Sequence, residues 1–464
     1  MKNCLGFFTV LLVCCYAFIT FSSGCAQIGT PTGGPRDTLP PVLVKASPDL
    51  KTLNFKGNKI SLNFDEYINV QDLQTNLLIS PVQKNNPVVT FNLKNVTLKF
   101  KDSLLPNTTY SINFGDAIRD NNESNIFKNF TYLFSTGNTI DSLSFNGKVL
   151  LAETGLVDTT IIAMLYRNAD DSAVIKRKPN YITKVNSDGS FSFQNLPADE
   201  FKVYALKDGD GGKTYNSKSE IFAFTDTIIT VSQNTPAITL YASAIEKVII
   251  KPSGGGTKKP ALEKRLRYTN SLELGRQSLL QPLQLNFNNS LKVFDAQKIL
   301  LTDTNFVPFT NAKITLDSTA KVLQVTIPWQ PDANYLLLLP KEAVLDSAGN
   351  SLTKNDTLKF KVKTTEDYGS VVIRFKNLDI SKHPILQFVE NENIKFSYPI
   401  TAPEWTNKLF PPGQYELRIL YDSNQNGIWD PGNYSKKLQP EKAITLPEKI
   451  SIRANWDNER DIQL

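Results

Sequence analysis

Two stretches of this 464-residue chain repeat one another without a gap. Residues 196–216 read LPADEFKVYALKDGDGGKTYN, and residues 410–430 read FPPGQYELRILYDSNQNGIWD. Each copy is a proline turn, an alternating strand and an Asp/Asn/Gly loop, in which Asp208 aligns with Asp422. Each loop then closes on an aromatic residue. A repeat of this kind indicates one supersecondary unit built twice, so we expect a tandem array of small units.

A second pattern, in which apolar and polar residues alternate, runs through residues 42–136 and returns in residues 265–365. Alternation with period two predicts half-buried antiparallel strands, and the intervening Gly, Pro and Asn residues are turn signals. About seven short strands in about 100 residues predict a β-sandwich. The matching apolar triplets are Ile60, Leu62 and Phe64 with Leu283, Leu285 and Phe287, and Val96, Leu98 and Phe100 with Leu323, Val325 and Ile327.

Two further motifs resemble known domain families. Residues 105–120, LPNTTYSINFGDAIRD, are matched by residues 330–346, QPDANYLLLLPKEAVLD, and this pattern resembles the bacterial Ig-like domain of S-layer type, the SbsA Ig-like family. Residues 346–350, DSAGN, fit the turn of that family, whereas the first copy has DNNE at residues 120–123 and lacks the glycine. The Asp188-Gly189 turn, the FSF strand and the LPA turn resemble the transthyretin-like carboxypeptidase-regulatory module.

The two kinds of unit alternate along the chain. They predict an all-β fold of tandem antiparallel β-sandwiches in an A-B-A-B arrangement behind a signal peptide. The expected segments are a signal peptide at 1–24, a flexible tether at 25–38, an Ig-like domain at 39–137, a transthyretin-like sandwich at 138–243, a linker at 244–264, a second Ig-like domain at 265–366 and a second transthyretin-like sandwich at 367–464.

All the cysteines lie close to the N-terminus. They are Cys4, Cys14, Cys15 and Cys25. A disulfide framework is therefore excluded for the body of the protein. The formal net charge of +6 is small for this length and gives no reason to expect a nucleic-acid partner.

The first 25 residues are typical of an exported lipoprotein. Lys2 precedes an apolar run at residues 5–20, which is short for a membrane-spanning helix and so indicates a signal peptide. Ser22, Ser23 and Gly24 then lead directly into Cys25, which resembles the bacterial lipobox without its usual leucine. The resemblance implies that Cys25 is lipidated and anchors the protein. An ordinary secretory signal with an incidental cysteine is the alternative.

The residues that follow the signal peptide indicate where in the cell the protein is located. Residues 25–37, CAQIGTPTGGPRD, and the A-B-A-B layout resemble Ig-like-domain lipoproteins of Bacteroidota. Ala26 follows the cysteine where an Asp would favour the inner membrane, so the resemblance implies an outer-membrane lipoprotein. Whether it faces the periplasm or the cell surface stays open.

The second copy of the repeated loop has the spacing of a calcium site, with side-chain oxygens at alternate positions and Gly427 at the turn. The candidate ligands are Asp422, Asn424, Asn426 and Asp430. The twelfth position is Asn433 in place of glutamate, and strands in place of helices flank the loop, so this is no EF-hand. The alternative is a turn in which Asp and Asn side chains bond their own backbone.

The remaining features give no catalytic motif. His383 is the single histidine, and it precedes Pro384 without a recognisable partner. Trp405 and Trp429 align with Phe191 and Tyr215, so core packing is favoured over stacking on sugars. We therefore expect a non-catalytic envelope lipoprotein that is a structural or protein-interaction module. The alternatives are a glycan-binding surface lipoprotein and a hydrolase, which would need a cleft with two convergent carboxylates.

Overall fold

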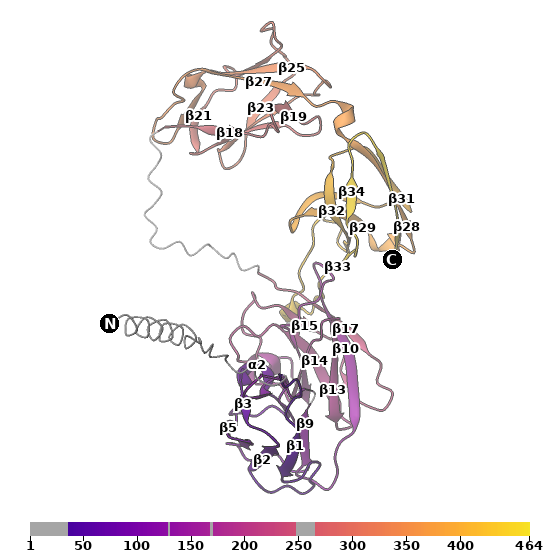
Figure 1. The fold of residues 1–464 in the computed structure, drawn as a ribbon. Helices are drawn as coiled ribbons and strands as arrows, with labels where there is room; N and C mark the ends of the chain where they lie inside the picture. Colours follow the sequence, from indigo (N-terminus) through magenta and orange to yellow (C-terminus); the bar gives the residue numbers. More distant parts are fainter. Residues whose placement is uncertain (1–35, 129, 168–169, 247–264) are drawn as a thin grey trace, which may run out of the picture. The chain divides into compact units, whose positions relative to one another are not determined.

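The computed structural model describes residues 36–128, 130–167, 170–246 and 265–464 (Figure 1). The chain divides into two compact units, residues 1–141 and residues 142–464. The predicted signal peptide and Cys25 lie outside the described residues, as do most of the tether and most of the linker. Among the residues that are described, no helix has the length and apolar character needed to cross a bilayer.

The first unit contains one β-sandwich, here called the first sandwich. One sheet has the order β1-β2-β6-β5, and the other has the order β4-β7-β9. The short strands β3 and β8 pair with one another, and the helix α2 (Leu73–Asn76) precedes β4. The strands are β1 (Leu43–Ser47), β2 (Lys59–Phe64), β3 (Ile68–Val70), β4 (Leu78–Ser80), β5 (Val88–Asn92), β6 (Asn95–Lys99), β7 (Thr109–Asn113), β8 (Ile118–Asp120) and β9 (Thr131–Ser135).

The alternating residues of the first sandwich form its core, as the sequence predicts. Leu62 of β2 and Leu98 of β6 are buried against Ile112 of β7. The backbone N–H of Leu105 donates to the Tyr110 hydroxyl at 2.7 Å, which closes the turn before β7. Because every second residue of a strand faces the core, alternation alone places these side chains correctly.

The second unit begins with the second sandwich, which is built from β10 to β17. Its β10 pairs antiparallel with β13 and parallel with β17. The other sheet has the order β12-β11-β14-β15, with β16 also bonded to β14, and the helix α3 (Ala173–Lys176) follows β11. The strands are β10 (Leu143–Leu151), β11 (Ile162–Arg167), β12 (Tyr181–Lys184), β13 (Ser190–Leu196), β14 (Glu200–Leu206), β15 (Phe222–Phe224), β16 (Ile229–Thr230) and β17 (Ile238–Ala242).

The third sandwich has the strand orders β18-β20-β24-β23 and β19-β27-β25-β22, with β21 paired to β26. The first order is equivalent to β1-β2-β6-β5, and the second contains the equivalent of β4-β7-β9. The elements are β18 (Tyr268–Asn270), β19 (Arg276–Gln277), β20 (Leu283–Phe287), β21 (Leu291–Phe294), β22 (Leu300–Thr302), β23 (Lys313–Leu316), β24 (Val322–Thr326), β25 (Asn334–Leu339), η1 (Lys341–Ala343), β26 (Val344–Asp346) and β27 (Asp356–Val362).

The fourth sandwich has the strand orders β31-β28-β35 and β30-β29-β32-β33, with β34 also bonded to β32. The elements are η2 (Thr365–Asp367), β28 (Gly369–Lys376), η3 (Ile380–Lys382), β29 (Pro384–Glu390), β30 (Asn393–Pro399), β31 (Glu404–Phe410), β32 (Gly413–Tyr421), η4 (Tyr434–Lys436), β33 (Lys442–Thr445), β34 (Ile450–Ile452) and β35 (Asp457–Gln463).

The second and fourth sandwiches have the same topology. In both, the first strand lies between an antiparallel neighbour and a parallel one, because β28 pairs in parallel with β35 as β10 does with β17. The predicted all-β fold of tandem β-sandwiches is therefore confirmed, with the addition of these parallel pairs. Alternation has the same period in parallel and antiparallel strands, so the sequence pattern does not distinguish them.

Candidate interaction site around the Asp422 loop

The repeated loop of the fourth sandwich begins where β32 ends. Asp422 is buried, and its carboxylate accepts the backbone N–H groups of Asn426 at 3.2 Å and of Gly427 at 2.8 Å. Gly427 has a φ of +82°, a left-handed conformation that a residue with a Cβ adopts at a cost. The carboxylate and the glycine together fix the turn.

The two asparagines of the loop converge on one carboxylate oxygen. The Nδ2 groups of Asn424 and Asn426 donate to Asp430 Oδ2 at 2.5 and 2.6 Å. Their Oδ1 atoms accept backbone N–H groups two residues further on, which makes two successive Asx turns. The four predicted ligands therefore lie together, and their polar atoms bond to one another and to the backbone.

A buried glutamate, which the sequence reading missed, completes this loop. Glu441 is 7% exposed; its Oε1 accepts the N–H and the hydroxyl of Ser423 at 2.8 Å, and its Oε2 accepts the N–H of Asp430 at 3.1 Å. In the second sandwich, Glu220 occupies the same strand register and accepts the N–H groups at 216 and 217 at 3.0 Å. Loops of different length precede the two glutamates, and this hides their equivalence in the sequence.

Calcium stays a prediction for this loop. Within the described residues, no group of three or more His, Cys, Asp or Glu side chains is arranged to hold a metal ion. Asp422 and Asp430 would supply the carboxylates, and Asn424 and Asn426 would have to turn their amide oxygens toward the ion.

Beyond the loop, the chain continues into a segment that contacts the second sandwich. We call residues 432–445 the clamp segment. Its Tyr434 begins η4, and the side chain of Asn433 accepts the N–H of Lys436 at 3.2 Å to cap that short helix. The Tyr434 ring then lies in an aromatic pocket of the second sandwich. Ring centroids lie 5.8 Å away for Tyr204, 5.3 Å for Phe222, 5.1 Å for Phe224 and 6.4 Å for Tyr215.

The Tyr434 hydroxyl is satisfied inside this pocket. It donates to the backbone oxygen of Asp171 at 2.7 Å and lies 3.1 Å from the Tyr204 hydroxyl. Burial, together with the hydrogen bond to Tyr204, raises the pKa of Tyr434 well above its usual range. The side chain therefore enters the pocket as a neutral phenol with its polar atom paired, which avoids the cost of a buried unpaired group.

Polar contacts surround the tyrosine. Lys437 Nζ lies 2.9 Å from Asp171, and hydrogen bonds from Lys202 and Lys437 lower the pKa of that carboxyl. Gln439 Nε2 donates to the backbone oxygen of Phe224 at 3.2 Å and to Asp226 at 2.9 Å. An apolar centre with a polar rim is the usual anatomy of a protein interface.

The clamp segment also extends the backbone hydrogen bonding. The N–H groups of Ala443 and Thr445 donate to the backbone oxygens of Ala152 and Thr154 at 2.7 and 3.0 Å. Gly155 has a φ of +71°, and a Cβ there would lie 2.7 Å from the Ala443 oxygen. Because β33 also pairs with β32, backbone hydrogen bonds run from the fourth sandwich into the second.

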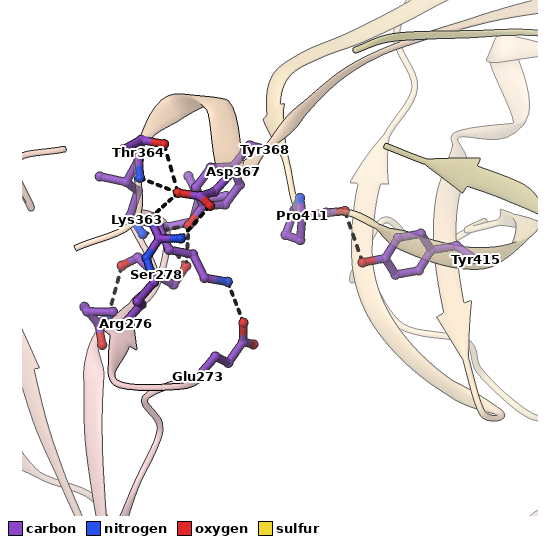
Figure 2. A network of polar contacts seen from close by, with 12 residues as sticks. Glu273, Arg276, Ser278, Lys363, Thr364, Asp367, Tyr368, Pro411 and Tyr415 are labelled. Atoms are coloured by element: carbon purple, nitrogen blue, oxygen red, sulfur yellow. Dashed lines mark hydrogen bonds and ion pairs between the residues drawn. The ribbon is translucent and has the colours of Figure 1, made fainter. Parts of the chain in front are cut away.

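A second joint links the third and fourth sandwiches (Figure 2). Arg276 donates two hydrogen bonds to Asp367, at 2.7 and 2.5 Å, and Asp367 also accepts the N–H and hydroxyl of Thr364. The Tyr368 hydroxyl accepts the N–H of Leu279 at 2.8 Å. Burial alone would raise the pKa of Asp367, but the hydrogen bonds from Arg276 and Thr364 lower it below its usual value.

The aromatic residues mostly pack as predicted. Trp329 and Trp405 contact the hydrophobic cores of their sandwiches, and Trp429 packs on Ala443 while its Nε1 donates to the Glu441 oxygen at 2.8 Å. Trp456 is 60% exposed, with the Arg453 guanidinium 5.3 Å from its ring.

One cleft is lined by two glutamates. It has a volume of about 620 Å³, and Glu153, Glu246 and Trp429 are among the residues that line it. Glu246 pairs with Lys218 at 3.7 Å, and both side chains are about two-thirds exposed. The two carboxylates of a glycosidase converge on the bond that they cleave, whereas Glu246 is exposed and paired with Lys218.

Comparison with known proteins gives a partial match. Residues 37–136 match the bacterial Ig-like domain family. No curated protein matches the chain. One similar solved structure is the major pilin subunit BcpA of Bacillus cereus, which is 8% identical, covers 70% of this chain and 99% of its own, and has a TM-score of 0.19. The TIE protein of Bacillus anthracis is 10% identical, covers 93% of this chain and 76% of its own, and has a TM-score of 0.17. The N-terminal part of the S-layer protein SbsC is 17% identical, covers 45% of each chain, and has a TM-score of 0.16. Residues 37–136 are thus similar to a bacterial Ig-like domain, within an all-β array of β-sandwiches.

Proposed function

We propose that this chain is a non-catalytic lipoprotein of the bacterial outer membrane, anchored through Cys25, that acts as a structural or protein-interaction module. The match of residues 37–136 to bacterial Ig-like domains supports a bacterial envelope protein. The small residues that precede Cys25 support lipidation. Burial of acyl chains stabilises membrane binding by about 0.8 kcal/mol per methylene, and stable anchoring takes more than one chain.

The observation that carries this proposal is that the polar groups of the Asp422 loop and of the clamp segment are occupied by hydrogen bonds within the protein. This part of the chain is rich in carboxylates, amides and aromatic rings, as a reactive or ligand-binding loop would be. Its polar atoms bond to one another, and Tyr434 and Gln439 bond to the second sandwich. A loop with these contacts holds neighbouring sandwiches together, which is what a scaffold requires.

The anchor is tested by labelling cells with palmitate and separating their membranes. The wild type and a Cys15→Ala control should incorporate label and sediment with the outer membrane. Cys25→Ala should lose both properties, because Cys15 lies within the predicted signal peptide and Cys25 immediately after it. If Cys25→Ala still sediments with membranes, the anchor is assigned wrongly.

The proposed role as a structural or protein-interaction module is tested by purifying the protein from detergent-solubilised membranes. A scaffold should copurify with a defined envelope protein or glycan, and protease treatment of intact cells should show whether the chain faces the surface or the periplasm. A purified protein that turns over a glycoside substrate would contradict the non-catalytic proposal.

A further inference from the structure

A cleft beside the clamp segment has the chemistry of a small-molecule site. Its volume is about 730 Å³, within the range of about 300–1,000 Å³ that is typical of ligand sites. Tyr241 of the second sandwich lines it, and so do Tyr421 and Lys442, which are paired residues of β32 and β33. Lys382 and His383, at the end of η3, also line it.

Each tyrosine ring in the cleft has a lysine ammonium above it. Lys442 Nζ lies 4.2 Å from the Tyr241 ring centroid, and Lys382 Nζ lies 6.0 Å from the Tyr421 centroid. A cation at this distance is attracted to the ring face. The rings therefore help to hold the two positive charges at the cleft.

The two lysines differ in their partners. Lys382 lies 3.2 Å from the Asp379 carboxylate. Lys442 makes no ion pair within the part of the chain that the structure describes. The carboxylate nearest to it in sequence, Glu441, accepts hydrogen bonds from Ser423 and Asp430 through both of its oxygens. The Lys442 ammonium is thus available to an anionic group of a ligand.

His383 also lines a second cleft. The neighbouring cleft has a volume of about 610 Å³, and His383 and Ser397 are among the residues that line it. His383 is exposed, and its Nε2 lies 3.3 Å from Gln425 Nε2. Two compartments that share one side chain fit an occupant made of linked units better than a single compact molecule.

We propose that these two clefts bind an acidic saccharide chain, with a sugar carboxylate on Lys442 and a sugar ring against Tyr421. The sugar ring takes the place of the Lys382 ammonium above Tyr421, and Lys382 keeps its partner Asp379. A carboxylate forms a charge-assisted hydrogen bond to an ammonium, and an aromatic ring offers a rigid apolar face to the carbon side of a sugar. The next sugar unit lies beyond His383. This goes beyond the proposed function and does not depend on the lipid anchor, since it gives the scaffold a ligand of its own.

The test is titration calorimetry on the detergent-purified protein with a tetrasaccharide of galacturonic acid, and with maltotetraose as the neutral chain. We expect the acidic chain to bind, binding to weaken at high salt, and maltotetraose not to bind. Lys442→Gln should weaken binding about tenfold, because it removes one charge-assisted hydrogen bond. Lys442→Arg should retain binding, and the exposed Lys449→Gln is the matched control that should bind like the wild type.

Three results would overturn the proposal. They are no binding of the acidic chain, equal binding of both chains, and equal affinity in Lys442→Gln and the wild type. Palmitate labelling through Cys25 is measured separately, so a failure here leaves the anchor intact.

Discussion

The hydroxyl groups of Tyr204 and Tyr434, which are 230 positions apart in the chain, lie 3.1 Å from one another. Tyr204 belongs to β14 of the second sandwich and Tyr434 to the clamp segment of the fourth. Burial raises the pKa of both phenols. This contact joins the two copies of the sequence repeat into one structural unit.

Removing the Tyr434 side chain should loosen the clamp segment. Tyr434→Ala empties the aromatic pocket and should cost about 3–5 kcal/mol in the free energy of unfolding. Tyr434→Phe keeps the ring but leaves the Tyr204 hydroxyl and the Asp171 oxygen with one partner fewer, and should cost about 1–3 kcal/mol. Urea unfolding measures both. The exposed Tyr67→Phe is the control, and a Tyr434→Ala variant as stable as this control would contradict the packing of Tyr434 in the aromatic pocket.

Gly155 should be intolerant of a side chain. Gly155→Ala combines an unfavourable positive φ with a Cβ that would lie 2.7 Å from the Ala443 oxygen, so we expect the clamp segment to detach. A carbodiimide can join Lys437 directly to Asp171, because the two charged groups lie 2.9 Å apart. The cross-link should form in the wild type and fall in Gly155→Ala. Gly211→Ala is the control, since Gly211 also has a positive φ and no atom within 4 Å of its Cβ position.

The joint between the third and fourth sandwiches should weaken in acid. The pKa of Asp367 is lower in the folded chain than its usual value, so its carboxylate stabilises the fold above the unfolded pKa of about 3.9. That contribution is lost as the pH falls below this value and through the folded pKa. Asp367→Asn should lower stability at neutral pH and reduce the loss that occurs as the pH falls below about 4, as measured by thermal unfolding. An unchanged pH dependence would show that Asp367 is not the responsible group.

Calcium should act through the second copy of the loop. We expect millimolar calcium to raise the melting temperature of the purified protein, Asp422→Ala to abolish the rise, and Asp208→Ala to leave it. Lys213 lies within the equivalent loop of the second sandwich, at the position of Gly427, and its charge disfavours a cation there. If calcium has no effect on the wild type, the Asx turns at Asn424 and Asn426 are the whole role of the loop.

The sequence predicts the sandwiches well and their contacts poorly. Alternation places Leu62, Leu98 and Ile112 in the core, because a strand has two faces and one of them is buried. The repeat predicts that Tyr215 and Trp429 are structural, and both are packed, Tyr215 on Phe222 and Trp429 on Ala443. Tyr215 also lies 6.4 Å from Tyr434 of the fourth sandwich.

The contacts between sandwiches are not predictable in this way. Tyr434 has no counterpart in the first copy, so comparison of the repeats says nothing about it. Its pocket is formed by Tyr204, Tyr215, Phe222 and Phe224, and no pattern in the sequence links these residues to position 434. Glu441 was missed because a loop of different length separates it from the repeated motif. Contacts between residues that are far apart in the sequence produce no repeating pattern along it.

Hydrogen exchange at the amides of Ala443 and Thr445 tests the clamp segment most directly. These N–H groups donate to Ala152 and Thr154 of the second sandwich, and a hydrogen-bonded amide in a stable interface exchanges slowly. We expect both amides to be protected in the wild type and to exchange rapidly in Tyr434→Ala and Gly155→Ala. The Ile444 amide, which faces β32, should stay protected in all three proteins. Rapid exchange of Ala443 and Thr445 in the wild type would contradict the joining of the two sandwiches.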